Sequence, residues 1–550
     1  MTAKQGKFKI LEQFAADGMT LMFGNPGTVE QGLLDALDQT PGFRYVLTLQ
    51  ETVAAGIADG YARAAGGPAL VQLHSGVGLG NAVGMLYQSM RGHTPLVVIA
   101  GEAGVRYEAM DAQMAADLVA MARPVTKHAT RVTSSQSLLR VLRRAVKIAM
   151  TPPRGPVFVS LPMDVLDELN DEPVVPASIP LTATAPSAGT VAGAAELLAG
   201  AERPLVLVGD GVGLSGAQAE LVRVAELLGA DVWAVDSSEV NMPASHPLAR
   251  GQLGHMFGEH SAAVTGVADA VLIVGTYVFP EVFPALDSPF RPDAKIVHID
   301  LNAYEIAKNF PVDLGLVADP KATLAMLGAA LAERLTPADL KAASVRRAVR
   351  ETEAGRRRAQ VARADVTGST LRAFLKELAA AAPDDLVVFD EALTASPAIA
   401  DYFPADRPGS YFLTRGGSLG VGIPGAIGAK LAHPGRTVVG FTGDGGAMYT
   451  YQALWTAARY DVGAKFVVCN NGKYKLLDDN IEQYWRERDI PPHAFPSSFD
   501  LSHPRIRFAE LARGLGVEGI RVEKPEQAAE GVRRMLASPG PFVVDLSTLP

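Results

Sequence analysis

Short apolar runs alternate with amphipathic stretches along almost the whole chain. Residues 70–73, 96–100 and 157–161 are examples, bounded by Gly, Pro or a polar turn. A continuous apolar run followed by a helical pattern is typical of a strand that is buried on both faces and connected by a helix to the next parallel strand. The sequence therefore predicts an α/β fold built from mainly parallel sheets flanked by helices.

Two stretches interrupt this alternation. Residues 171–189 are rich in Pro, Ala, Ser and Thr, which predicts a linker, and residues 336–366 are densely charged, which predicts an exposed helical connector. A chain of 550 residues is too long for one core. We therefore expect three domains, at 1–180, 190–335 and 365–550.

The composition narrows the range of partners. With 50 basic and 59 acidic residues the net charge is −9, which argues against a nucleic-acid or anionic membrane surface. We interpret the arginines of 336–366 as a solvated helix face rather than a polyanion site. No stretch approaches 18 uninterrupted apolar residues, and Cys469 is the single cysteine. We expect a cytoplasmic protein without a membrane or nucleic-acid partner.

The third segment carries the strongest chemical signal. An apolar run at 438–441 leads into Gly443, Asp444, Gly445, Gly446 and Ala447, and a helical stretch is expected at 451–460. The glycines allow the backbone to approach a phosphate, and a helix N-terminus offers unpaired N–H groups. A second apolar run, 465–469, ends at Asn470 and Asn471. Asp444 and Asn471 thus supply hard oxygen ligands, which suit Mg²⁺ shared with a diphosphate.

This pairing of Gly-Asp-Gly with Asn-Asn, each after its own strand, resembles the diphosphate-binding motif of thiamine-diphosphate (ThDP) enzymes. The resemblance implies that Asp444, Asn471 and the main-chain carbonyl of Lys473 bind Mg²⁺. It also implies that the cofactor is bound by Gly443, Asp444, Gly445, Gly446, Ala447, Asn471 and Tyr474.

The resemblance extends to the groups that activate the cofactor. The family's activating glutamate, which hydrogen-bonds the pyrimidine ring, lies at a strand end, and Glu51 matches it in the expected strand 47–51. A glutamate there would otherwise be a solvated surface residue. The family bends the cofactor over a bulky apolar side chain beside a glycine carbonyl, and Leu419 and Gly417 match these roles. Packing in the core is a second reading of Leu419.

Within the family, nearly the whole chain is similar to the benzoylformate decarboxylases. The likeness is carried by residues 23–30, 49–62, 73–75, 453–458 and 470–474. It implies that Thr28 replaces a serine that binds the substrate carboxylate, and that His74 shuttles protons, a role suited to histidine. A lone histidine beside a strand end would otherwise be structural. Leu476 and Leu477 are expected to line the substrate pocket.

The chain also departs from that pattern. The second active-site histidine should fall near residues 276–282, where Val282 takes its place with Glu281 adjacent, so the group that replaces it stays open. The adjacent histidines of pyruvate decarboxylases are absent. Residues 475–499 are longer than their counterpart and are expected to form a lid. The apolar run and glycine-rich turn at 205–213 invite a dinucleotide reading, but the pattern is not G-x-G-x-x-G, and we do not expect FAD.

The expected function is non-oxidative decarboxylation of an aromatic or bulky apolar 2-oxo acid to an aldehyde and CO₂. The alternative is a ThDP-dependent carboligase or lyase, similar to acetolactate synthases or 2-hydroxyacyl-CoA lyases. Little sequence follows 542–546 to form the C-terminal lid of an acetolactate synthase. A non-catalytic ThDP-binding regulatory protein is a third reading, against which Glu51, His74, Asp444 and Asn471 together argue. The resemblance implies a homodimer with sites shared between subunits, commonly paired into a homotetramer. The exact substrate, and whether decarboxylation or carboligation is physiological, stay open.

Overall fold

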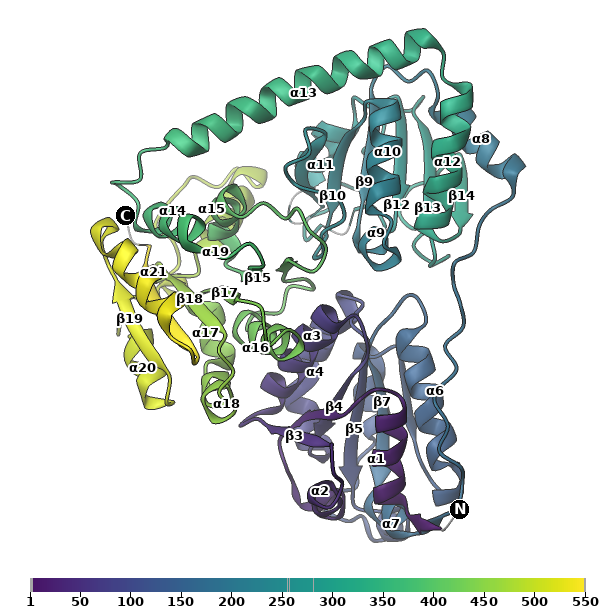
Figure 1. Cartoon of the computed structure of the whole chain (residues 1–550), viewed down its shortest axis with the longest axis vertical. Coiled ribbons are helices and arrows are strands. Elements are labelled where there is room, and N and C mark those ends of the chain that lie inside the picture. Colours follow the sequence, from purple (N-terminus) through teal and green to yellow (C-terminus); the bar gives the residue numbers. More distant parts are fainter. Residues whose placement is uncertain (1–2, 255, 257, 280, 549–550) are drawn as a thin grey trace. The chain divides into compact units, whose positions relative to one another are not determined.

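The computed structural model describes residues 3–254, 256, 258–279 and 281–548. The chain forms two compact units. One comprises Met1–Pro180, Val366–Tyr402 and Thr414–Pro550, and the other comprises Leu181–Asp365 and Phe403–Leu413. Each of the three segments of the sequence contributes a parallel sheet flanked by helices, as predicted (Figure 1).

The first segment builds a six-stranded parallel sheet in the order β3-β2-β4-β5-β7-β6. Apolar side chains of α1, α2 and α6, among them Phe14, Leu37 and Leu142, pack on one face of it. A short antiparallel pair, β1 (Lys4–Gln5) with β8 (Leu169–Asn170), ties the two ends of the segment together. The other elements are β2 (Leu21–Gly24), α2 (Gln31–Asp38), β3 (Arg44–Leu47), α3 (Glu51–Ala65), β4 (Ala69–Leu73), α4 (Ser75–Arg91), β5 (Leu96–Glu102), α5 (Leu118–Ala122), β6 (His128–Arg131), α6 (Leu138–Met150), β7 (Val157–Pro162), α7 (Met163–Asp167), and α1 (Gly6–Ala16).

The third segment belongs to the same compact unit and contributes parallel strands in the order β15-β17-β18-β20-β19. Its helix α16 lies against α3 of the first segment, and glycines permit this contact because a Cβ on Gly60 would lie 2.1 Å from the carbonyl oxygen of Gly425. The elements are α14 (Thr370–Ala381), β15 (Val387–Glu391), α15 (Ser396–Tyr402), α16 (Gly422–Ala432), β17 (Val438–Gly443), α17 (Asp444–Thr450), α18 (Ala453–Arg459), β18 (Lys465–Asn470), α19 (Lys475–Glu487), α20 (Phe508–Gly514), β19 (Glu518–Val522), α21 (Ala528–Ala537) and β20 (Phe542–Ser547).

The central segment forms the second unit around a parallel sheet in the order β11-β10-β9-β12-β13-β14. Side chains of α8, α10 and α12 cover one face of this sheet with a continuous apolar core. The elements are α8 (Ala188–Leu198), β9 (Pro204–Val208), α9 (Asp210–Ser215), α10 (Gln218–Leu228), β10 (Asp231–Val235), β11 (Ala249–Leu253), α11 (Gly258–Thr265), β12 (Ala270–Val274), β13 (Lys295–Asp300), β14 (Leu314–Val317), α12 (Pro320–Arg334) and α13 (Pro337–Arg363). Residues 403–413, which belong to the same compact unit, contain the short strand β16 (Tyr411–Leu413).

Both predicted connecting stretches are confirmed. Residues 171–187 contain no helix or strand, and α13 is a helix of 27 residues in which Ala343 alone is buried. A capping box formed by Thr336 and Asp339 begins this helix. Within the described part of the chain, none of the helices has the length and apolarity needed to cross a lipid bilayer.

One local prediction is wrong, and another is incomplete. Residues 47–51 do not form a strand ending in Glu51, because β3 ends at Leu47 and Glu51 is the first residue of α3. The side chain of Gln50 caps that helix by accepting from the backbone N–H groups of Thr52 and Val53. The helix expected at 451–460 is present as α18, but a further helix precedes it, because α17 begins at Asp444 itself.

Candidate active site

The carboxylate of Glu51 lies buried between α3 and α4. Asn25 donates to Oε1 at 3.1 Å, and Asn81 donates to Oε2 at 2.9 Å. A Cβ on Gly78 would lie 2.8 Å from Oε1, so only glycine leaves room for the carboxylate on this turn of α4. No basic side chain of the described residues forms an ion pair with Glu51, which leaves the carboxylate without charge compensation.

His74 is held by a second buried carboxylate, that of Glu30. The distance between His74 Nδ1 and Glu30 Oε2 is 2.9 Å, and Gly101 N–H donates to Glu30 Oε1 at 2.9 Å. Burial raises the pKa of Glu30, while the hydrogen bond with His74 opposes that rise. The imidazole lies directly on Gly27, where a Cβ would be 1.8 Å from Nδ1. Glu30 is not recognisable from the sequence, because its partner lies 44 positions away and no local pattern marks the pair.

The strand order explains why these groups meet. Glu51 follows β3, Thr28 follows β2 and His74 follows β4, and β3-β2-β4 are neighbours in a parallel sheet. The carboxyl ends of parallel strands lie on one edge, the usual position of ligand sites in α/β folds. Thr28 is exposed and begins the short 3₁₀ turn Thr28–Glu30, which ends at the glutamate of the His74–Glu30 pair.

In the third segment, Asp444 and Asn471 follow the neighbouring strands β17 and β18. Gly472 N–H donates to Asp444 Oδ2 at 2.6 Å, which joins the two strand ends. Asp444 is buried, and burial raises its pKa despite the N–H donors around it. It has no ion-pair partner among the described residues, so a divalent cation would supply the missing positive charge.

This donor set fits Mg²⁺ better than a transition metal. Among the described residues, no group of three or more His, Cys, Asp or Glu side chains could hold a metal ion. The strand ends instead offer one carboxylate, the amide oxygen of Asn471 and the nearby main chain of Lys473. Mg²⁺ is commonly held by one or two carboxylates together with phosphate oxygens, which a diphosphate would provide.

The glycine-rich turn is a helix turn rather than an open loop. Gly443 precedes α17, whose first turn contains Gly445, Gly446 and Ala447. A Cβ on Gly445 would lie 2.3 Å from the ring of Tyr474, so this ring packs against the turn.

The loop that carries Gly417 and Leu419 has an unusual backbone path. Gly416, Gly417 and Gly420 all have positive φ values, of 85°, 75° and 95°. Leu419 is only half-buried, and its side chain therefore differs from an ordinary core leucine.

The expected lid at 475–499 contains helix α19 and a returning segment. Trp485 is buried and stacks on Phe495, with ring centroids 5.8 Å apart. Backbone hydrogen bonds from Tyr474 N to Phe499 O (2.9 Å) and from Leu501 N to Gly472 O (2.8 Å) join the two ends of the stretch. Leu476 and Leu477 lie in the first turn of α19, and Leu477 is 37% exposed.

The stretch expected to replace the second histidine lies in the central segment. Glu281 is buried, and its Oε1 has no hydrogen-bond partner among the described residues, whereas Val282 is exposed. Pro280, which precedes them, lies outside the described residues.

The glycine-rich turn after β9 has a packing explanation. A Cβ on Gly211 would lie 2.5 Å from the Cα of Gly275, and one on Gly209 would lie 2.4 Å from Thr276 Cβ. The Asp210 carboxylate accepts hydrogen bonds from the backbone N–H groups of Ser238 and Glu239. These residues therefore hold the end of β9 against neighbouring turns, and no nucleotide is needed to account for the glycines.

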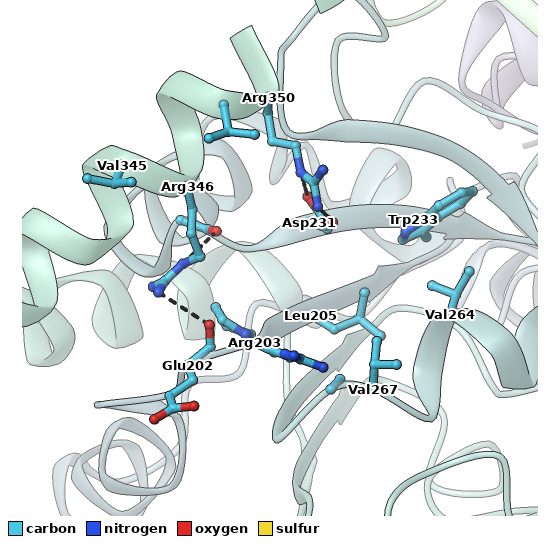
Figure 2. A pocket seen from close by; sticks show the side chains of 14 residues that line it. Glu202, Arg203, Leu205, Asp231, Trp233, Val264, Val267, Val345, Arg346 and Arg350 are labelled. Atoms are coloured by element: carbon cyan, nitrogen blue, oxygen red, sulfur yellow. Dashed lines mark hydrogen bonds and ion pairs between the residues drawn. The ribbon is translucent and has the colours of Figure 1, made fainter. Parts of the chain in front are cut away.

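A cavity of about 430 Å³ lies in the central segment, between α13 and the first residues of β9 and β10. Figure 2 shows Arg346 and Arg350 reaching from α13 toward these strands. Arg350 makes two hydrogen bonds to Asp231, at 2.7 and 2.6 Å, and Arg346 donates to the carbonyl of Leu228 at 2.6 Å. Protein groups engage both guanidinium groups, so the two arginines attach α13 to the central segment.

Comparison with known proteins agrees with this geometry. Three family models match: "Thiamine pyrophosphate enzyme, N-terminal TPP binding domain" at residues 4–121, the central domain at 191–327, and "C-terminal TPP binding domain" at 394–546. A benzoylformate decarboxylase of Pseudomonas aeruginosa is 31% identical, over 100% of this chain and 99% of that protein. A probable acetolactate synthase large subunit of Methanocaldococcus jannaschii is 29% identical, over 98% of this chain and 91% of that protein.

A solved structure extends the likeness to three dimensions. The thiamine diphosphate-dependent 4-hydroxybenzoylformate decarboxylase of Rhodococcus jostii superposes with a TM-score of 0.85 and 28% identity, covering 99% of each chain. Full-length similarity, three matching domains and two sets of polar groups at strand ends thus point to one conclusion. The chain belongs to the thiamine pyrophosphate enzyme family and is a homologue of benzoylformate decarboxylase.

Proposed function

We propose that this ThDP-dependent enzyme decarboxylates a 2-oxo acid with an aromatic or bulky apolar group, releasing an aldehyde and CO₂. The observation that supports this most is the His74–Glu30 pair. Glu30 engages Nδ1, while Nε2 has no hydrogen-bond partner in the described part of the chain and the side chain is 17% exposed. An oriented imidazole with one accessible nitrogen is suited to donate a proton, which is the step that yields an aldehyde.

ThDP, when bound, would supply a nucleophilic carbon for the substrate ketone and a ring that accepts the electron pair left by CO₂. Glu51 would hydrogen-bond the pyrimidine ring, and the carbonyl of Gly417 would accept from its amino group. Thr28 would donate to the substrate carboxylate, and His74 would protonate the carbon that has lost CO₂. Leu419 would support the bent cofactor, while Leu476 and Leu477 would contact the apolar part of the substrate.

Mg²⁺ is proposed at Asp444, Asn471 and the carbonyl of Lys473, with the first turn of α17 and Tyr474 around the diphosphate. Asp444→Ala should remove the one anionic ligand and weaken ThDP binding by roughly a hundredfold or more, on the scale of losing a charged buried contact. Calorimetric titration with ThDP and Mg²⁺ measures this. Glu526→Ala, which removes an exposed carboxylate, is the matched control. Wild-type affinity in Asp444→Ala would remove Asp444 from the metal site.

The second candidate is carboligation on the same cofactor, and the likeness to acetolactate synthases favours keeping it. The two reactions differ in what the activated carbon attacks, a proton or a second carbonyl. A panel of 2-oxo acids with ThDP and Mg²⁺ separates them when CO₂ and aldehyde are measured with and without an acceptor aldehyde. We expect aldehyde in an amount equal to CO₂ for benzoylformate-like acids. A hydroxyketone as the main product would favour the carboligase, and no turnover of any acid would favour a regulatory ThDP-binding protein.

The proposed active unit is a homodimer, and we propose that two such dimers form a homotetramer. Helix α4 supports this, because Val77 (63% exposed), Gly80, Gly84 and Tyr87 (46% exposed) present a small and apolar face to solvent. We further propose domains at 1–180, 190–335 and 365–550. The buried thiol of Cys469, without a disulfide, suits the reducing cytoplasm proposed as the protein's location.

A further inference from the structure

A buried carboxylate that no proposed role has used lies at the end of β15. Glu391 is 1% exposed and accepts from four donors. Gly422 N–H donates to Oε2 at 2.7 Å, Thr442 Oγ1 donates to Oε2 at 3.1 Å, and Val421 N–H donates to Oε1 at 3.2 Å. Gly420 N–H also donates to Oε1. No basic side chain among the described residues pairs with it.

Three of these donors belong to the loop that carries Gly417 and Leu419. Gly420, Val421 and Gly422 connect that loop to α16, and they direct successive N–H groups at one carboxylate. Because the preceding residues adopt left-handed φ values, local preference alone does not determine the path of the loop. The Glu391 carboxylate therefore fixes where the loop ends and α16 begins.

The same carboxylate also contacts the diphosphate turn. Thr442 is two residues before Asp444 on β17, and its hydroxyl is the fourth donor. A Cβ on Gly446 would lie 3.5 Å from the Glu391 carboxyl carbon, so the group lies beneath the first turn of α17. One side chain thus touches both segments that are proposed to hold the cofactor.

We infer that Glu391 is a positioning residue: it ties the Leu419 loop to the Asp444 turn, so that the two segments are already aligned when ThDP arrives. The inference rests on the proposed roles of Leu419 and Asp444. A bound cofactor would contact both segments at once, and their alignment before binding lowers the ordering cost that binding must otherwise overcome.

The chemistry of the site requires a carboxylate. Burial raises the pKa of Glu391 to about 7, and the four donors oppose this effect. All four donors need an acceptor, which the two carboxylate oxygens provide. Glutamine has the same shape, but one of the two oxygens is replaced by an NH₂ group. This group is a donor and would face the donors that now bond to that oxygen. Glu391→Gln therefore removes the hydrogen bonds of one carboxylate oxygen without creating a cavity.

The test uses the full-length protein and two measurements on Glu391→Gln. Hydrogen–deuterium exchange of the cofactor-free protein should be faster in the peptide covering residues 416–423. Calorimetric titration with ThDP and Mg²⁺ should show affinity weaker by roughly tenfold, as expected for an unsatisfied buried donor. Asp210→Asn is the matched control, because Asp210 is a buried carboxylate that accepts from backbone N–H groups in the central segment. It should leave both readings at the wild-type value.

Each outcome has a distinct meaning. Faster exchange with unchanged ThDP affinity would make Glu391 merely structural and overturn the inference, as would wild-type behaviour in both measurements. If Glu391→Gln does not fold, Thr442→Val removes a single donor and should change both readings in the same direction to a smaller extent. If the wild-type protein itself fails to bind ThDP, the proposed cofactor site is wrong, whereas a wild type that binds ThDP but turns over no 2-oxo acid contradicts the proposed reaction alone.

Discussion

Asn25 and Asn81 hold one oxygen each of the Glu51 carboxylate, and Gly78 leaves the space in which it lies. Amide donors orient a carboxylate, but they bring no positive charge to it. A ring nitrogen that gains a proton is stabilised by such a neighbour. The charge of Glu51, rather than its shape, is therefore expected to matter for cofactor activation.

Glu51→Gln separates the two properties, because glutamine keeps the length and removes the charge. The variant should still bind ThDP, while exchange of the cofactor's C2 proton for deuterium slows by about 10² or more, the range typical of acid–base groups. Quenched-flow exchange followed by NMR measures this rate, and calorimetry confirms that the cofactor is bound. Exchange at the wild-type rate would remove Glu51 from cofactor activation.

His74 and Glu30 form a pair whose members should contribute unequally. His74→Ala removes the proposed proton donor, and kcat for benzoylformate-like acids should fall by about 10²–10⁴. Glu30→Gln keeps an acceptor for Nδ1, and its loss should be smaller. Steady-state kinetics on both variants checks this order. If His74→Ala has the rate of the wild type, another group donates the proton, and Glu281 is the next candidate.

At the scale of the elements, Gly78 of α4 leaves the space that the Glu51 side chain of α3 occupies. Gly78→Ala should reduce activity, because a Cβ 2.8 Å from Glu51 Oε1 forces the carboxylate to move. Alanine is otherwise the better helix former, so the melting temperature should fall little. Gly193→Ala in α8 is the control, since a Cβ there meets no atom within 4 Å. Equal activity of the two variants would show that the position of Glu51 tolerates displacement.

The sequence predicts the buried strands and misplaces two helix starts, for identifiable reasons. Apolar runs such as 438–441 and 465–469 become β17 and β18 because parallel strands are buried on both faces. The alternation of Leu47, Thr48, Leu49 and Gln50 imitates a strand, and the glutamine cap that begins α3 is not among the common capping residues. Glycines usually mark turns, yet Gly445 and Gly446 lie inside α17. At Gly445 the ring of Tyr474 leaves no room for a side chain.

The residues of the proposed site also divide into those that the sequence predicts and those that it does not. Asp444, Asn471, Glu51 and His74 stand in short motifs that can be recognised from the chain itself. Their supporting partners cannot, because Asn81, Glu30 and Glu391 contact residues 29 to 71 positions away through strand order and helix packing. Local sequence contains no record of such contacts.

At the scale of the whole molecule, the proposed homodimer shares each site between two subunits. The first segment supplies Glu51 and the third supplies Asp444, so a mixed dimer of Glu51→Gln and Asp444→Ala would contain one doubly defective and one intact site. Activity should return when the two inactive proteins are mixed under conditions of subunit exchange, to about a quarter of the wild-type value for random pairing of dimers.

Native mass spectrometry establishes whether subunits have exchanged, and each variant mixed with itself is the control. Confirmed exchange without recovery of activity would mean that each site is built within one chain.

The long helix α13 also constrains how this chain can vary in length. Arg346 and Arg350 attach its first half to the central segment, and its second half is exposed before the chain enters the third segment. An α-helix turns by about 100° for each residue, so inserting one residue between Arg346 and Arg350 would turn Arg350 away from Asp231. Changes in the length of this helix should therefore be tolerated in its exposed second half and rejected between the two arginines that attach it.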